Sequence, residues 1–143
     1  MGADRLLLVH GGGEEDAQQV LLALSRSWPD VVVDGPVDAV SLVPWLRARR
    51  STPPRLVLLD LDHDPVGATM AVTALRQDPG APRLPVLALS GHPAPADVAA
   101  WYEAGVDGWL FRSGDFALLQ TTLATGLQYW LSRPGAGPTE PGA

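Results

Sequence analysis

The sequence of 143 residues contains no cysteine, lysine, asparagine or isoleucine. The lack of cysteine excludes disulfide bonds and zinc sites built from thiolates. Positive charge is also scarce, because the net charge is −6 and the ten basic residues are all arginines. Apart from Arg47, Arg49 and Arg50, these arginines are scattered along the chain. A nucleic-acid surface needs a basic patch, so we expect no nucleic-acid partner.

Long apolar runs are missing as well. No run approaches the length of roughly 20 residues that a membrane span needs, and the Leu6–Val9 run is too short for a signal peptide. We therefore expect a cytoplasmic protein with no membrane partner. Hydrophobic residues make up 46% of the chain and charged residues 18%, which suits one folded domain. We assign residues 1–132 to this domain and the Pro/Gly-rich residues 133–143 to a disordered tail.

Short apolar segments alternate with segments of helical periodicity. We predict strands over residues 5–9, 30–34, 56–59, 84–89 and 108–111, and helices over residues 14–27, 38–49, 66–77, 96–104 and 115–131. In the second helix, Val40, Val43 and Leu46 are expected to face inward. Segment 56–59 is the most uniformly apolar, as expected for a strand covered on both faces. The alternation predicts an α/β fold with a parallel sheet between two layers of helices.

Polar residues follow four of the predicted strands. In such a sheet, ligands bind at the carboxyl ends of the strands. Asp60 could act there as a nucleophile, Ser90 could donate to a phosphoryl oxygen, and Arg112 could pair with its charge. These residues predict a site for a phosphoryl group. The residues at the strand ends are His10, Gly11, Asp60, Asp62, Asp64, Ser90 and Arg112.

From Arg5 to about Leu131, the sequence resembles the receiver domain of two-component response regulators. Segment 56–62 is similar to the phosphoacceptor segment of that family, 84–90 to the segment ending in the switch Ser/Thr, and 102–113 to the stretch with the switch aromatic and a lysine. The resemblance implies a flavodoxin-like (βα)5 doubly wound parallel sheet with strand order 2-1-3-4-5. It also implies that Asp60 is the phosphoacceptor and that Ser90, Trp109 and Arg112 are switch or phosphate-contact residues.

Two further features are similar to the single-domain regulators that partner bacterial phytochrome histidine kinases. Ser113 stands after the family's lysine position, where most receivers have proline, and the chain carries the aromatic pair Tyr129 and Trp130 near its end. This resemblance implies a histidine kinase as partner, of the phytochrome type.

The sequence departs from the family at the metal site. The family has two adjacent acidic residues after the first strand, where this chain has His10 and Gly11, and Arg112 replaces the lysine. Mg²⁺ prefers a near-octahedral shell of hard oxygen ligands, and only Asp60 and the backbone carbonyl of Asp62 remain from the usual set. We therefore expect weak Mg²⁺ binding, no resident cofactor and no enzymatic activity. The side chains that could still build a weak site are Glu14, Glu15, Asp62 and Asp64.

His10 has two interpretations. It could be a cation that neutralises Asp60 and follows pH, or it could fill the space of the lost metal site and hydrogen-bond Asp60 or a carbonyl; we favour the second. Arg112 is expected to form an ion pair with Asp60. Trp109 on an edge strand is more typical of surface packing than of a switch.

The preferred hypothesis is a divergent (pseudo-)receiver, a single-domain response regulator that acts through protein–protein interaction. The alternative is a working phosphoacceptor that is phosphorylated on Asp60 with unorthodox or no Mg²⁺ ligation. A small-molecule sensor using the glycine-lined cleft is a third hypothesis. Aromatic residues near the end of the chain favour an interface and a homodimer, although the same rings could only pack the edge of the core. The interface candidates are Trp101, Trp109, Tyr129 and Trp130.

Three short motifs resemble known functional motifs, but each lacks a residue that the function requires. His10–Gly13 matches the oxyanion loop of lipases, but the sequence has no G-x-S-x-G elbow. The same glycines would need a further glycine at position 16 to bind a dinucleotide, and Asp16 stands there. The Asp60-x-Asp62-x-Asp64 spacing is that of a calcium loop, but Pro65 replaces its essential glycine.

Overall fold

The structure, a computed structural model, describes residues 4–91 and 93–131. Five parallel strands form one sheet in the order β2-β1-β3-β4-β5, so the predicted fold class and strand order are confirmed. The predicted tail, residues 133–143, lies outside the described residues. The strands are β1 (Arg5–Val9), β2 (Val32–Val37), β3 (Leu56–Asp60), β4 (Val86–Ser90) and β5 (Gly108–Phe111).

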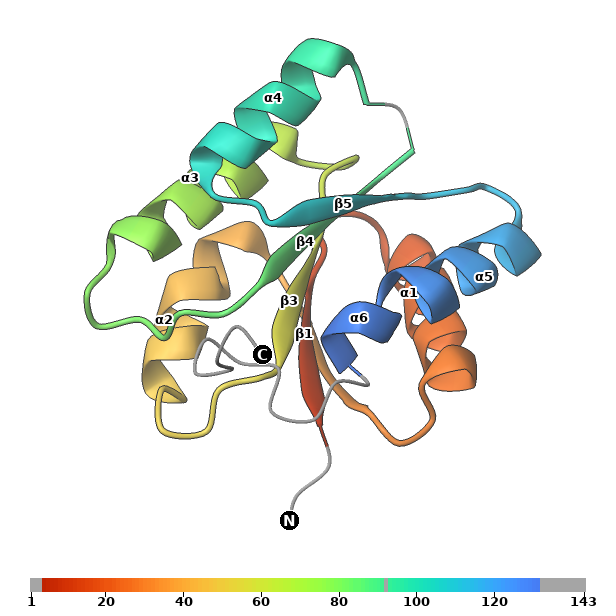
Figure 1. Cartoon of the computed structure of the whole chain (residues 1–143), viewed down its shortest axis with the longest axis horizontal. Coiled ribbons are helices and arrows are strands. Elements are labelled where there is room, and N and C mark those ends of the chain that lie inside the picture. The colour runs from red at the N-terminus through yellow and green to blue at the C-terminus, as the bar shows by residue number, and fades with distance from the viewer. Residues whose placement is uncertain (1–3, 92, 132–143) are drawn as a thin grey trace.

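Helices cover both faces of the sheet (Figure 1). Helices α1 (Glu14–Ser27), α5 (Phe116–Gly126) and α6 (Gln128–Leu131) lie on one face, and α2 (Leu42–Ala48), α3 (Pro65–Gln77) and α4 (Pro95–Ala104) lie on the other. Each layer buries its own cluster of apolar side chains against the sheet. Within the described residues, no helix is both long enough and apolar enough to cross a membrane.

Strand β3 occupies the centre of the sheet, between β1 and β4. All of its side chains are buried, as its uniformly apolar sequence predicts. Val9 pairs with Leu59 on one side, and Asp60 pairs with Leu89 on the other. Because Asp60 ends this central strand, its carboxylate is held at the carboxyl edge of the sheet, and the residue as a whole is only 2% exposed.

Strand β2 begins and ends later than residues 30–34, the predicted range. It runs along the edge of the sheet, where the missing N–H group of Pro36 is tolerated. The register with β1 shifts between Leu7 and Val9, and Gly35 there has a φ of 99°. A Cβ atom on Gly35 would lie 2.6 Å from the carbonyl oxygen of Leu8, so the shift depends on glycine. The alternation rule could not predict this irregularity.

The last predicted helix, 115–131, is divided in two. Asp115 caps α5 by accepting a hydrogen bond from the Leu118 N–H group, and α5 ends at Gly126. Gly126 packs so closely on Leu110 that a Cβ atom would approach the leucine side chain to 2.6 Å. The short helix α6 then buries Leu131 against the sheet.

The second helix is also shorter than predicted. Asp38 caps a turn of 3₁₀-helix, η1 (Ala39–Ser41), by accepting hydrogen bonds from both the backbone N–H and the hydroxyl group of Ser41. Helix α2 begins only after this turn. The turn leaves Val40 81% exposed, so its predicted inward orientation was wrong, whereas Leu46 is buried.

Candidate functional site

The carboxyl edge of the sheet brings the predicted residues together. His10 follows β1, Asp60 ends β3 and Ser90 ends β4, and all three are buried. Arg112 follows β5, where its N–H group donates to the Ser90 carbonyl. The strand ends therefore converge as the parallel topology predicts. The contacts among the side chains differ from the prediction.

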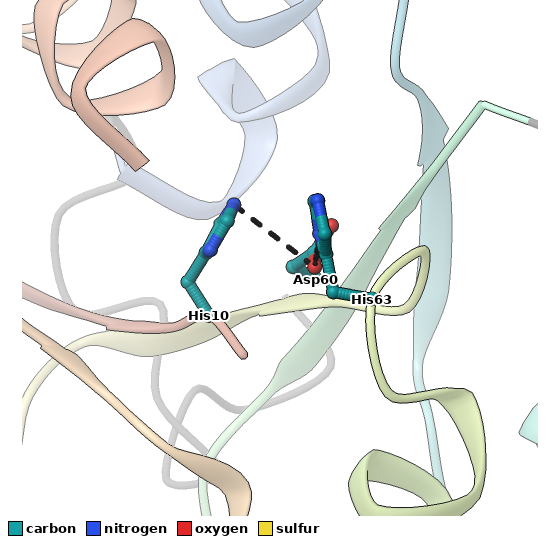
Figure 2. A group of neighbouring side chains, drawn as sticks. All are labelled: His10, Asp60 and His63. Carbon is teal, nitrogen blue, oxygen red and sulfur yellow. Dashed lines mark hydrogen bonds and ion pairs between the residues drawn. The ribbon is translucent and has the colours of Figure 1, made fainter. Parts of the chain in front are cut away.

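Asp60 is held by His63, a residue that the sequence analysis did not single out. Nδ1 of His63 lies 2.7 Å from Oδ2 of Asp60, and Nε2 lies 2.8 Å from Oδ2 of Asp16 in helix α1 (Figure 2 shows the Asp60 contact). A histidine that faces a carboxylate with each ring nitrogen can donate to both only when it is protonated. The bond to Asp60 is the main cause that raises the pKa of His63, and the bond to Asp16 adds to it, whereas burial lowers it. In its protonated form, His63 thus places a positive charge against the buried carboxylate of Asp60.

His10 lies on the other side of Asp60. Its Nδ1 atom accepts a hydrogen bond from the Gly12 N–H group at 3.1 Å. Its Nε2 atom points toward Asp60 but stays 4.0 Å from Oδ2 (Figure 2), too far for a hydrogen bond. Burial is the largest cause that lowers the pKa of His10, outweighing the attraction of Asp60, so the ring is neutral and forms no true ion pair. Among the described residues, this Nε2 atom has no hydrogen-bond partner.

Both sequence interpretations of His10 need correction. The ring is not the cation that neutralises Asp60, because His63 takes that role. Its side chain also makes no hydrogen bond to Asp60 or to a carbonyl group within the part of the chain that the structure describes. It does fill the space beside Asp60, with the two imidazole ring centres 4.9 Å apart.

Arg112 does not pair with Asp60, so that prediction was wrong. One of its nitrogen atoms donates to the backbone oxygen of Asp16 at 3.4 Å and lies 3.9 Å from the Asp16 carboxylate. The first turn of α1 thus supplies Arg112 with a partner, while His63 occupies Asp60. Across residues 4–91 and 93–131, the Nε atom of Arg112 is buried without a hydrogen-bond partner.

Asp62 is directed toward the end of β4. Its carboxylate accepts a hydrogen bond from the Ser90 hydroxyl at 2.9 Å and from the Gly91 N–H group at 2.9 and 3.1 Å. A hydroxyl group and a backbone N–H group that converge on one anion resemble a cradle for a phosphoryl oxygen. Here an acidic side chain of the same chain already lies in that cradle.

The other acidic candidates do not join Asp60. Asp64 caps helix α3 by accepting from the Gly67 N–H group at 3.0 Å. Glu14 and Glu15 are exposed in the first turn of α1. In this structure, these side chains are therefore not placed to complete a metal site with Asp60.

The Mg²⁺ ion that the receiver resemblance implies does not fit these residues. Gly11 offers no side-chain ligand, and the first side chain after β1 is the buried imidazole ring of His10. Imidazole nitrogens suit transition metals, whereas Mg²⁺ requires oxygen ligands in an octahedral shell.

The aromatic candidates divide into buried and exposed side chains. Trp101 is buried in the core, so it adds nothing to the surface of the single chain, contrary to its assignment to an interface. Its ring packs edge to face against half-buried Trp109, with centres 6.3 Å apart, which favours the packing interpretation of Trp109. Tyr129 is 57% exposed and Trp130 is partly buried beside it.

No protein-family model matches this sequence, and no curated protein matches it either. Solved structures do match. A response regulator in red-light signalling of R. palustris is 19% identical with a TM-score of 0.80, and the phosphorylated cyanobacterial phytochrome response regulator RcpA is 23% identical with a TM-score of 0.77. The Mn²⁺-bound form of the response regulator Rcp1 is 25% identical with a TM-score of 0.73.

Each of these matches covers 92% of this chain and 96% of the other. The likeness therefore extends over nearly the whole chain. The protein has the flavodoxin-like fold of response regulator receiver domains.

Proposed function

We propose that this protein is a divergent pseudo-receiver of two-component signalling, which acts by protein–protein contact without efficient metal-dependent phosphorylation. The observation that carries the proposal is the 2.7 Å contact between His63 and Asp60. The receiver fold and its phytochrome-associated structural neighbours support the signalling context.

The state of Asp60 opposes phosphotransfer. A carboxylate attacks a phosphoryl group through an oxygen atom that carries free negative charge. Oδ2 of Asp60 is bonded to the His63 ring, and Oδ1 accepts a weaker bond from the Asp62 N–H group at 3.4 Å. A charge-assisted hydrogen bond stabilises the carboxylate and makes it a poorer nucleophile.

The surroundings of Asp60 oppose it as well. A phosphoryl group that reached Ser90 and Gly91 would have to displace the Asp62 carboxylate from both donors. If Asp62 stayed, two negative groups would compete for the same hydrogen bonds. Phosphoryl transfer depends on neutralising charge at the transferred group, and Arg112 is directed toward Asp16.

A phosphodonor experiment tests the proposal. The protein is incubated with a small phosphodonor and Mg²⁺, and its intact mass is measured beside that of Asp60→Asn. We expect no added phosphoryl mass above the level of the variant. Clear incorporation that depends on Asp60 would instead support the alternative function, a phosphoacceptor with unorthodox or no Mg²⁺ ligation. The retained positions of Asp60 and Ser90 at adjacent strand ends favour that alternative.

The partners in this proposal are a histidine kinase, of phytochrome type, and a second copy of the chain in the cytoplasm. Three exposed apolar side chains support the homodimer. They are Phe111 in β5, Leu118 in α5 and Tyr129 in α6. Light scattering at micromolar concentration tests it. Leu118→Glu should shift the mass toward the monomer, while Val40→Glu, at a more exposed site on η1, should not. A wild-type monomer would exclude the dimer.

A further inference from the structure

One cluster in this protein has the composition of a transition-metal site. His10, Asp60 and His63 each contribute one ligand atom, and these three atoms lie within 4.8 Å of one another. The side chains come from the end of β1, the end of β3 and the loop after β3, and they face one another (Figure 2). We propose that this cluster binds a divalent transition metal of the Zn²⁺ class, through Nε2 of His10, the Asp60 carboxylate and a ring nitrogen of His63.

The buried nitrogen of His10 is the second observation that points to a ligand. Its side chain is fully buried, and Nε2 is directed at Asp60 with no hydrogen-bond partner among the described residues. Burying a polar atom without a partner is unfavourable, so such an atom calls for an explanation. A metal ion between His10 and Asp60 would supply the missing partner.

Of the distances between ligand atoms in the cluster, one is longer and one is shorter than the distance that a bound metal ion requires. Tetrahedral Zn²⁺ with bonds of about 2.0–2.1 Å places its ligand atoms roughly 3.3 Å apart. The His10–Asp60 distance is 4.0 Å, and the His63–Asp60 distance is 2.7 Å. A change of less than about 1 Å in these two distances, and of up to about 1.5 Å between the two histidine nitrogens, which lie within 4.8 Å of each other, would therefore suffice. His63 can make this change because its side chain is partly exposed in the loop before α3.

A further carboxylate stands behind the cluster. If Nδ1 of His63 binds the metal, Nε2 remains protonated and keeps its bond to Asp16 at 2.8 Å. A carboxylate that accepts from the second nitrogen of a ligand histidine fixes the ring and increases its basicity. Asp16 would thus be a positioning residue for the metal ligand.

Binding requires one hydrogen bond to be exchanged. Nδ1 of His10 now accepts from the Gly12 N–H group, so the neutral ring carries its proton on Nε2, the atom that would bind the metal. Ligation moves that proton to Nδ1, and the Gly12 peptide must then turn away. Glycines at positions 11–13 permit such a turn, and Gly12 packs so closely on the His63 ring that a side chain there would clash with it. Metal binding would therefore reshape the loop between β1 and α1.

Three protein ligands leave a fourth position of a tetrahedral ion for water or for a partner's side chain. The hard-ion site of the receiver fold would then be replaced by one selective for softer metals. This inference goes beyond the proposed function, because metal binding is measured without a phosphodonor. A chain that binds no metal would not change the expected result of the phosphodonor experiment. A chain that is phosphorylated would likewise not change the expected metal binding.

The test is a titration of the untagged full chain, freed of metal with a chelator. Calorimetry with Zn²⁺ and absorption spectroscopy with Co²⁺ should both show one ion per chain, with Mg²⁺ in tenfold excess failing to compete. We expect His10→Ala and His63→Ala each to weaken Zn²⁺ binding at least tenfold, and Asp16→Asn to weaken it less.

Controls separate this site from adventitious binding. Thermal unfolding in chelator establishes that each variant is folded, and His63→Ala, which changes a partly exposed side chain, remains informative if a buried His10 variant unfolds. His92→Ala removes the third histidine of the sequence and should leave the affinity unchanged. Absence of one-to-one binding would overturn the proposal, as would affinity that is lost in His92→Ala or retained in both cluster variants.

Discussion

Nδ1 of His63 lies 2.7 Å from Oδ2 of Asp60, so an imidazole ring is hydrogen-bonded to one of the two carboxylate oxygens of Asp60. The strength of this pair can be measured with a double-mutant cycle of His63→Ala and Asp60→Asn. Because Asp60 is buried and the bond carries charge, we expect a coupling free energy of about 1–3 kcal/mol in urea denaturation at pH 6.

A second ion pair provides a matched control for this cycle. Arg5 and Asp34 are 2.9 Å apart and share two hydrogen bonds, but the Arg5 side chain is 49% exposed, so their coupling should stay below about 1 kcal/mol. Equal coupling in the two cycles would contradict the special role of the His63–Asp60 pair.

The pH dependence of stability should carry the signature of His63. Its pKa is raised above the ordinary value of 6.5 in the folded protein. The stabilisation is therefore complete below the unfolded pKa and is lost as pH rises through the folded pKa. In chelator, the free energy of unfolding of the wild type relative to His63→Gln should fall as pH rises from about 6 toward 9. A constant difference across this range would contradict the assignment.

His10 should act in the opposite direction. Its pKa is lowered from 6.5, chiefly by burial, so the unfolded chain takes up a proton before the folded protein does. Its contribution therefore destabilises the protein as pH falls below 6.5. Histidine ring NMR signals in metal-free protein should titrate above 6.5 for His63 and below it for His10. The reverse order would show that the two roles are exchanged.

Asp62 should stabilise the conformation of Ser90 and Gly91 at the end of β4. Replacing it with Ala leaves the Ser90 hydroxyl and the Gly91 N–H group without its carboxylate. We expect faster hydrogen exchange at the Gly91 amide and a loss of stability of about 1–3 kcal/mol. Asp64→Ala removes the cap of α3 and should cost about 0.5–2 kcal/mol without any change at Gly91. Unchanged protection of Gly91 in Asp62→Ala would exclude the contact in solution.

Gly35→Ala tests the irregular edge of the sheet. The substitution forces a side chain into a φ of 99° and against the Leu8 carbonyl. We expect it to destabilise the fold by about 1–3 kcal/mol. Gly114→Ala, where a Cβ atom meets nothing within 4 Å, should have little effect. Thermal unfolding compares the two variants. Similar melting temperatures would contradict the requirement for glycine at position 35.

The sequence predicted the sheet well because its apolar segments are short and regular. The uniformly apolar segment before Asp60 marks the central strand, and parallel topology then brings the ends of neighbouring strands together. The convergence of His10, Asp60 and Ser90 follows from these two facts alone.

Side-chain directions in loops could not be predicted in the same way. Only two residues lie between Asp60 and His63, a spacing without periodic meaning outside a regular element, so only the loop conformation reveals their contact. Arg112 was assigned to Asp60 by proximity alone, while the first turn of α1 brings Asp16 closer to it. Val40 was placed inward by helical periodicity, but the chain there forms a 3₁₀ turn.

If the residues around Asp60 prevent metal-dependent phosphorylation, as proposed, replacing them should permit it. Gly11 has room for a side chain, with Asp64 Cβ 3.4 Å from a Cβ atom built there. A variant that combines His10→Asp, Gly11→Asp, His63→Ala and Asp62→Ala would therefore supply the adjacent acidic pair, release Asp60 and free the Ser90 and Gly91 donors. Intact mass after treatment with a small phosphodonor and Mg²⁺ is the decisive measurement. We expect a phosphoryl group on this variant and none on the wild type, and Asp60-dependent phosphorylation of the wild type would show that Asp60 is a working phosphoacceptor.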